Sequence, residues 1–135
     1  MEDGIPETLD DLLKKLLGAI PEVKAAVIVS TEGLPIASAL PEGVDETRIA
    51  AMTAALLSLS EKAIYEMKKG DFDQMYIKSS EGYLLILPAG PNAVLAVSTT
   101  QDMRLDFNFQ AGLTRFLQHP PGDSGSAGAS GLVDF

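Results

Sequence analysis

Three β-rich segments in the second half of the chain are separated by very short turns, and this spacing constrains the fold more than any other feature. We expect strands over residues 72–79, 83–87 and 93–99, joined through Gly82 and through the Pro-Ala-Gly-Pro-Asn sequence at 88–92. A parallel connection needs about a dozen residues or more. The three segments must therefore form antiparallel hairpins.

The first half of the chain adds two helices and two further strands. A helix is predicted over residues 8–20, because its leucines recur at the spacings of one helical face. Strands are predicted over 23–30 and 34–40 on either side of a turn at Gly33. Pro35 cannot donate a ladder hydrogen bond, so the second of these strands belongs at an edge of the sheet.

A long helix is predicted over residues 46–69, with Asp45 as its N-cap and Gly70 after its end. A last helix is predicted over 103–118. The element order is thus α-β-β-α-β-β-β-α. This order predicts an α+β fold in which a five-stranded antiparallel sheet lies between helices. We expect one domain over residues 1–118 and a disordered tail rich in Pro, Gly and Ser over 119–135.

The long helix carries two apolar arcs where a surface helix needs only one. We expect the first arc to lie on the sheet; it contains Leu59, Met52, Ala63, Leu56, Ile49 and Met67. The second arc is rich in small residues and contains Ile64, Leu57, Ala50 and Ala54, with Tyr65 at its rim. Because small residues allow helices to approach closely, we interpret the second arc as the contact with a second subunit.

The charge of the chain excludes several classes of partner. Its formal net charge is −9 and its basic residues do not cluster, whereas binding to nucleic acids or anionic membranes depends on basic patches. There are no cysteines, which excludes disulfides and thiolate chemistry. No stretch reaches the ~18 apolar residues of a membrane span, and the acidic N-terminus is unlike a signal peptide. We expect a cytoplasmic protein with no membrane insertion.

The residues that most often perform chemistry do not form a recognisable catalytic or metal-binding pattern. His119 is the only histidine, and it stands before two prolines without acidic or cysteine neighbours. Asp71 and Asp73 flank Phe72, where they more readily start a strand than form a catalytic pair. The chain has neither a phosphate-binding loop nor a G-x-S-x-G motif. We therefore expect no enzyme activity, no metal and no cofactor.

Three segments together resemble the roadblock / dynein light chain family, particularly its stand-alone prokaryotic members. They are IPEVKAAVIVSTEGLPIAS at 20–38, the long alanine-rich helix, and KKGDFDQMYIKSSEGYLLILPAGPNAVLAVST at 68–99. The resemblance covers residues 8–117 and rests on the order and spacing of these segments.

The resemblance implies a symmetric dimer in which the long helices pair and the third strands meet edge to edge. A heterodimer with a related chain is the other arrangement. The expected interface residues are Ala50, Thr53, Ala54, Leu57, Ile64, Phe72, Gln74, Met75, Tyr76 and Ile77. The resemblance also implies a non-catalytic scaffold or regulator that binds small Ras-like GTPases. Arg48, Glu61 and Lys68 at the ends of the paired helices are the candidate GTPase contacts.

Two alternatives stay open. A sandwich of this size can be a small-molecule sensor, which requires a central cavity with a few polar groups. It can also be a trafficking adaptor of the longin type, although longin domains place the sheet before the first helix. A filled core excludes the sensor, and a helix-first sheet that pairs across a two-fold axis excludes the longin.

Overall fold

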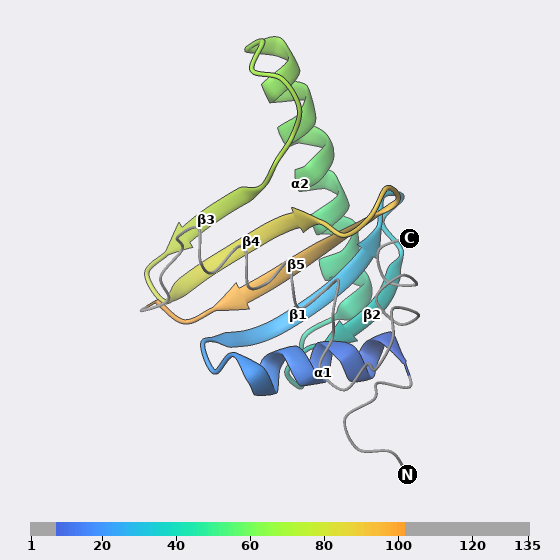
Figure 1. Ribbon diagram of the computed structural model, residues 1–135, viewed down its shortest axis with the longest axis vertical. Coiled ribbons are helices and arrows are strands. Elements are labelled where there is room, and N and C mark those ends of the chain that lie inside the picture. The colour runs from blue at the N-terminus through green and yellow to red at the C-terminus, as the bar shows by residue number, and fades with distance from the viewer. Residues whose placement is uncertain (1–7, 102–135) are drawn as a thin grey trace.

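The computed structural model describes residues 8–101 and contains two helices and one five-stranded sheet within them (Figure 1). The elements, in chain order, are α1 (Leu9–Ala19), β1 (Val23–Ser30), β2 (Pro35–Ala39), α2 (Glu46–Glu66), β3 (Met75–Ser79), β4 (Gly82–Pro88) and β5 (Ala93–Thr99). This order confirms the predicted α+β fold class. The predicted helix over 103–118, the tail over 119–135 and the boundary between them lie outside the described residues.

Both helices begin where a side chain caps their first turn. The Thr8 hydroxyl accepts a hydrogen bond from the Asp11 N–H at 3.1 Å, and α1 begins at the next residue. One carboxylate oxygen of Asp45 accepts from the N–H groups of Thr47 at 3.0 Å and Arg48 at 3.3 Å. The predicted helix starts therefore follow from local capping.

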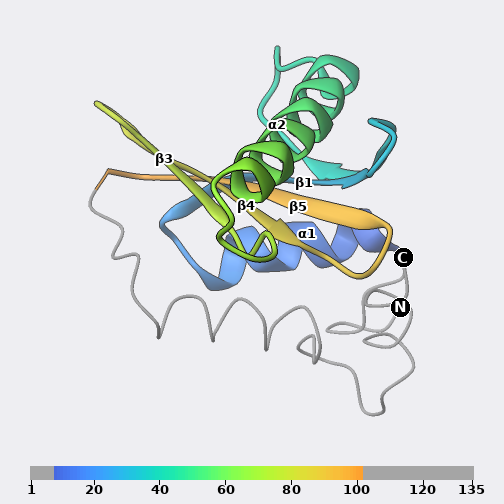
Figure 2. The same cartoon turned by 90° about the horizontal axis from the view of Figure 1, so that it is seen from above.

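The strands pair only with antiparallel neighbours, in the order β2-β1-β5-β4-β3. Strands β2 and β3 are thus the two edges, as predicted. The ladder between β1 and β2 shifts register next to Val29 and Pro35, so the proline sits at an irregularity. Figure 2 shows α1 on one face of the sheet and α2 on the other.

The space on each face of the sheet is filled by apolar side chains. On the α1 face, Leu12, Leu13 and Leu16 pack with Ile28 and Leu95. On the α2 face, Ala50 and Leu57 pack with Val27, Val29, Ile86, Val94 and Ala96. Within residues 8–101, the buried polar or charged side chains are those of Thr53 and Thr99. A core composed in this way lacks the polar groups that a small-molecule sensor needs, and the helix-first order is unlike a longin domain.

The predicted placement of the two apolar arcs of α2 is only partly right. Ile49 and Leu56, from the arc expected on the sheet, pack against the core on the α2 face, but the arc interpreted as a subunit contact faces the sheet as well. Ala50, Thr53 and Leu57 are buried, whereas Met52, Leu59 and Met67 are exposed. Small residues allow the helix to approach the sheet rather than another helix. A Cβ atom added to Gly33 in the β1–β2 turn would lie 3.6 Å from Ala54 Cβ, which is ordinary van der Waals contact. Periodicity identified both arcs but could not assign their partners.

The end of α2 and the start of β3 also differ from prediction. The helix ends at Glu66 with Met67 as C-cap, and the next residue, Lys68, has a left-handed backbone with φ of 57°. The Lys68 N–H donates to the Tyr65 carbonyl and the Lys69 N–H to the Ile64 carbonyl. This is a Schellman C-cap in which Lys68 occupies the position predicted for Gly70. The strand then begins at Met75, which leaves Phe72 and Gln74 in the connecting segment.

Candidate interaction surface on the second helix and third strand

The exposed side of α2 carries an apolar stripe, which we call the outer stripe and define as Met52, Leu56, Leu59 and Ala63. Met52 is 51% exposed and Leu59 64% exposed. Leu56 is half-buried at the edge of the stripe, where it also packs against the core on the α2 face, and Ala63 is exposed. The four positions follow one another at intervals of 4, 3 and 4 residues. This is the heptad spacing with which one helix packs against another helix.

Strand β3 forms an open edge of the sheet. Within the described residues, β3 pairs with β4 alone, so the backbone groups on its other side have no neighbouring strand. Tyr76 is 41% exposed and Ile77 is 38% exposed. Figure 1 shows the C-terminal part of α2 projecting past the β3 edge of the sheet. An open, partly apolar edge is a template for pairing with another strand.

The opposite edge, β2, is protected near its C-terminal end. The Ser38 N–H donates a hydrogen bond to Oδ1 of Asp10 on α1 at 2.8 Å. An acidic side chain therefore occupies a backbone donor that an added strand would need. The contrast between the two edges favours β3 as the edge that pairs.

Tyr76, on the open edge, has a raised pKa. Partial burial raises the pKa of its phenol, and the nearby carboxylate of Asp73 raises it further. Both causes favour the neutral, hydrogen-bonding form of the side chain. The phenol therefore stays uncharged on the surface where we expect a partner.

The predicted interface residues fall into three groups. Ala50, Thr53 and Leu57 are buried against the sheet of their own chain and do not reach the outer stripe. Ala54, Ile64, Phe72, Gln74 and Met75 are half-buried, and the Ser60 hydroxyl lies 4.0 Å from the Met75 sulfur. Tyr76 and Ile77 are exposed on the open edge. The role of all these residues in a dimer stays a prediction.

The three candidate GTPase contacts are exposed but do not lie together. Arg48 is in the first turn of α2 and Lys68 follows its last turn. At ~1.5 Å per residue, these positions are about 30 Å apart. Glu61 lies on the flank of α2 that faces the β4–β5 turn. One protomer therefore offers three separate charged contacts rather than one charged site.

Groups that could perform metal chemistry are not assembled in the described part of the chain. Among residues 8–101, no three His, Cys, Asp or Glu side chains gather as a metal ion would require. Asp71 precedes β3 and Asp73 acts on Tyr76, while His119 lies outside the described residues. Neither helix in this range is long and apolar enough to cross a membrane.

Sequence reasoning placed Met52 and Leu59 on the sheet, where they are not, and it did not anticipate the contact of Asp10 with β2. The heptad spacing of the outer stripe was visible in the sequence, but the inner face, including Ala50, Thr53 and Leu57, repeats at the same intervals. Local sequence carried no signal for Asp10, because its partner is 28 residues away.

Comparison of the sequence with known families and proteins gives a consistent result. The sequence model of the Roadblock/LC7 domain family matches residues 9–99. The uncharacterized protein MJ0310 of Methanocaldococcus jannaschii is 32% identical over 83 residues, which is 62% of this chain and 72% of that protein. The uncharacterized protein MJ0714 of the same organism is 30% identical over 99 residues, which is 73% of this chain and 83% of that protein.

Solved structures agree with the sequence matches. A Roadblock/LC7 domain from Streptomyces avermitilis superposes with a TM-score of 0.65 at 26% identity, covering 71% of this chain and 81% of that one. A second Roadblock/LC7 structure from Streptomyces avermitilis is 31% identical with a TM-score of 0.60, covering 82% and 95%. MglB of Myxococcus xanthus has a TM-score of 0.65, covering 72% and 73%, but its 19% identity supports the fold alone.

Proposed function

The chain belongs to the Roadblock/LC7 domain family, and on this basis we propose that it is a non-catalytic dimeric scaffold or regulator of small Ras-like GTPases in the cytoplasm. The observation that carries the proposal is that one protomer exposes both the outer stripe of α2 and the unpaired edge of β3. This surface combines a helix-packing seam with an unpaired strand. We propose that a second copy, or a related chain, covers it.

The geometry supports a side-by-side dimer. Two β3 edges related by a two-fold axis would join the sheets, and the projecting end of each α2 would then lie over the partner's sheet (Figure 1). The outer stripes would face each other in this arrangement. Ala63 is the small residue of the stripe, so it allows the two helices to approach closely where they cross.

Contact alone is sufficient for a regulatory effect on a GTPase. A Ras-like GTPase has switch segments whose order depends on its γ-phosphate. A dimer that binds one switch conformation more tightly by ~1–3 kcal/mol shifts the population of that conformation. Arg48, Glu61 and Lys68 are the proposed contacts on each protomer, and the dimer presents each of them twice.

The proposal is tested by a pull-down with the purified protein, followed by binding and turnover assays. The immobilised dimer is expected to capture a Ras-like GTPase whose nucleotide state is then determined. Its affinity for that GTPase, purified, should differ between the GDP form and a form loaded with a non-hydrolysable GTP analogue. A protein that is monomeric at micromolar concentration and captures no GTPase would contradict the proposal.

A further inference from the structure

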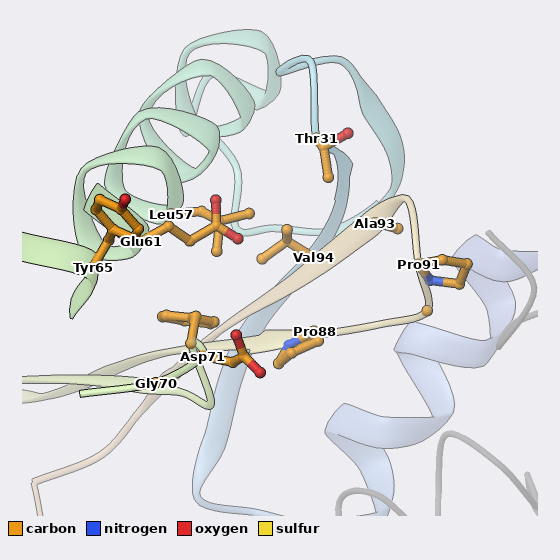
Figure 3. Close-up of a pocket in the computed structure, with 12 residues that line it drawn as sticks. Thr31, Leu57, Glu61, Tyr65, Gly70, Asp71, Pro88, Pro91, Ala93 and Val94 are labelled. Atoms are coloured by element: carbon orange, nitrogen blue, oxygen red, sulfur yellow. The ribbon is translucent and has the colours of Figure 1, made fainter. Parts of the chain in front are cut away.

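A cleft of about 350 Å³ lies on the flank of α2 that faces the β4–β5 turn. Leu57, Tyr65 and Glu61 line it from the helix, and Phe72 and Asp71 from the segment after the helix. Pro88 and Val94 line it from the sheet (Figure 3). We call it the side cleft. At ~100° per residue, Leu59 of the outer stripe lies about 200° around the helix from Leu57, so the side cleft and the outer stripe are on different sides of α2.

The lower part of the side cleft is apolar and held in place. Leu57 and Val94 are buried members of the core on the α2 face, and Phe72 packs against the same core. The Thr31 N–H donates to the Asn92 carbonyl at 3.2 Å, which ties the β1–β2 turn to the β4–β5 turn. The cleft is therefore built between fixed elements, and its apolar surface can accept an aliphatic chain.

Two carboxylates stand on opposite walls above this apolar surface. Figure 3 shows Glu61 on the helix and Asp71 on the connecting segment, both turned toward the same space. In the described range of the chain, neither carboxylate makes an ion pair or a side-chain hydrogen bond. Their charges are thus available to a cation that enters the cleft.

We propose that the side cleft receives an arginine side chain from an exposed loop of a partner protein. The aliphatic stem of arginine fits the apolar surface formed by Leu57, Phe72 and Val94. Its planar guanidinium donates to carboxylates in a fixed fork and stacks on aromatic rings, which Phe72 and Tyr65 provide. The net charge of −9 favours the approach of a basic partner over an acidic one. The volume is at the lower end of the ~300–1,000 Å³ of ligand pockets and is large enough to admit one long side chain.

This inference does not depend on dimerisation or on GTPase binding, and it can be tested separately. The probe is the peptide acetyl-Leu-Arg-Leu-amide, titrated into the ¹⁵N-labelled full chain and followed by backbone amide shifts. The control peptide carries citrulline, which has the shape of arginine without its charge. Amides around the cleft, such as those of Gly70, Gly90 and Val94, should shift. The arginine peptide should bind about 2- to 30-fold more tightly, as expected for two exposed charge pairs.

Two variants test whether Glu61 and Asp71 cause the preference for the arginine peptide. Glu61→Gln combined with Asp71→Asn should abolish the preference for arginine over citrulline and leave the fold unchanged, because both side chains are exposed. Glu81→Gln, a loss of one exposed acid in the β3–β4 turn, should retain the preference. Equal affinity for the two peptides, amide shifts away from the cleft, or an undiminished preference in the double variant would each overturn the proposal.

Discussion

Replacing Leu59 by alanine should weaken a dimer without weakening the protomer. Leu59 is 64% exposed in the single chain, so about two-thirds of its surface is left for a partner to bury. Burial of a whole leucine side chain contributes ~1.5–3 kcal/mol, which gives about 1–2 kcal/mol per copy. Both copies are changed in a dimer, and the loss of about 2–4 kcal/mol raises the dimer Kd about 30- to 1,000-fold.

Leu57→Ala is the matched control, because Leu57 is only two residues away but faces the sheet. Its side chain is 8% exposed, so truncation should lower the free energy of unfolding by ~2–5 kcal/mol. Sedimentation equilibrium from nanomolar to micromolar concentration measures the Kd, and urea denaturation measures the stability of each variant. The reverse result, in which Leu57→Ala dissociates a stable protomer and Leu59→Ala leaves the dimer intact, would refute the assignment of the two faces.

Four further changes test other parts of the structure. Met75→Pro on the open edge should raise the dimer Kd more than Ile36→Pro on the protected edge, and equal losses in sedimentation would argue against pairing through β3. Gly82→Ala should lower the free energy of unfolding by ~3 kcal/mol or more in urea denaturation, because a Cβ there collides with the Thr99 carbonyl oxygen; an unchanged midpoint would contradict this. The pKa of Tyr76 is raised on folding, so its protonated phenol favours the folded state. This contribution is present in full at pH values below the unfolded pKa of 10.0 and should be lost as the pH rises through the folded pKa. Tyr76→Phe should reduce the fall in stability as the pH rises above 10.0, and an unchanged pH profile of stability in the variant would contradict this role of Tyr76. Arg48→Ala should lower GTPase affinity about 2- to 5-fold and leave stimulation at saturating protein intact, whereas a loss of stimulation by orders of magnitude with binding preserved would make Arg48 catalytic.

Most of the fold could be predicted because local signals determine it. The short turns at Gly82 and at 88–92 require hairpins, and Thr8 and Asp45 cap the two helices where expected. The two edge strands followed from Pro35 and from the position of β3 after a helix. Each of these features depends on residues close together in the chain.

The candidate surface was harder to predict because it depends on contacts between distant segments. Both arcs of α2 are apolar and repeat at the same intervals, so the choice between sheet and partner depends on how Ala50 and Leu57 pack with side chains of distant strands. The left-handed residue of the helix cap is Lys68, whose neighbours bond to the carbonyls of the preceding turn, whereas Gly70 has a positive φ of 92° two residues further on. Sequence patterns describe one segment at a time, so they do not predict contacts between segments that are distant in the chain.

The hydrogen bond between Asp10 and Ser38 also has a consequence for how far the chain can polymerise. A sheet with two receptive edges can add copies at both ends without limit and grow into a fibre. Here one edge carries a carboxylate on a backbone donor of β2, so two copies joined through β3, as proposed, would present the blocked β2 edge at both outer ends. A single side chain from α1 would then limit the size of the proposed assembly without taking part in any contact between its copies.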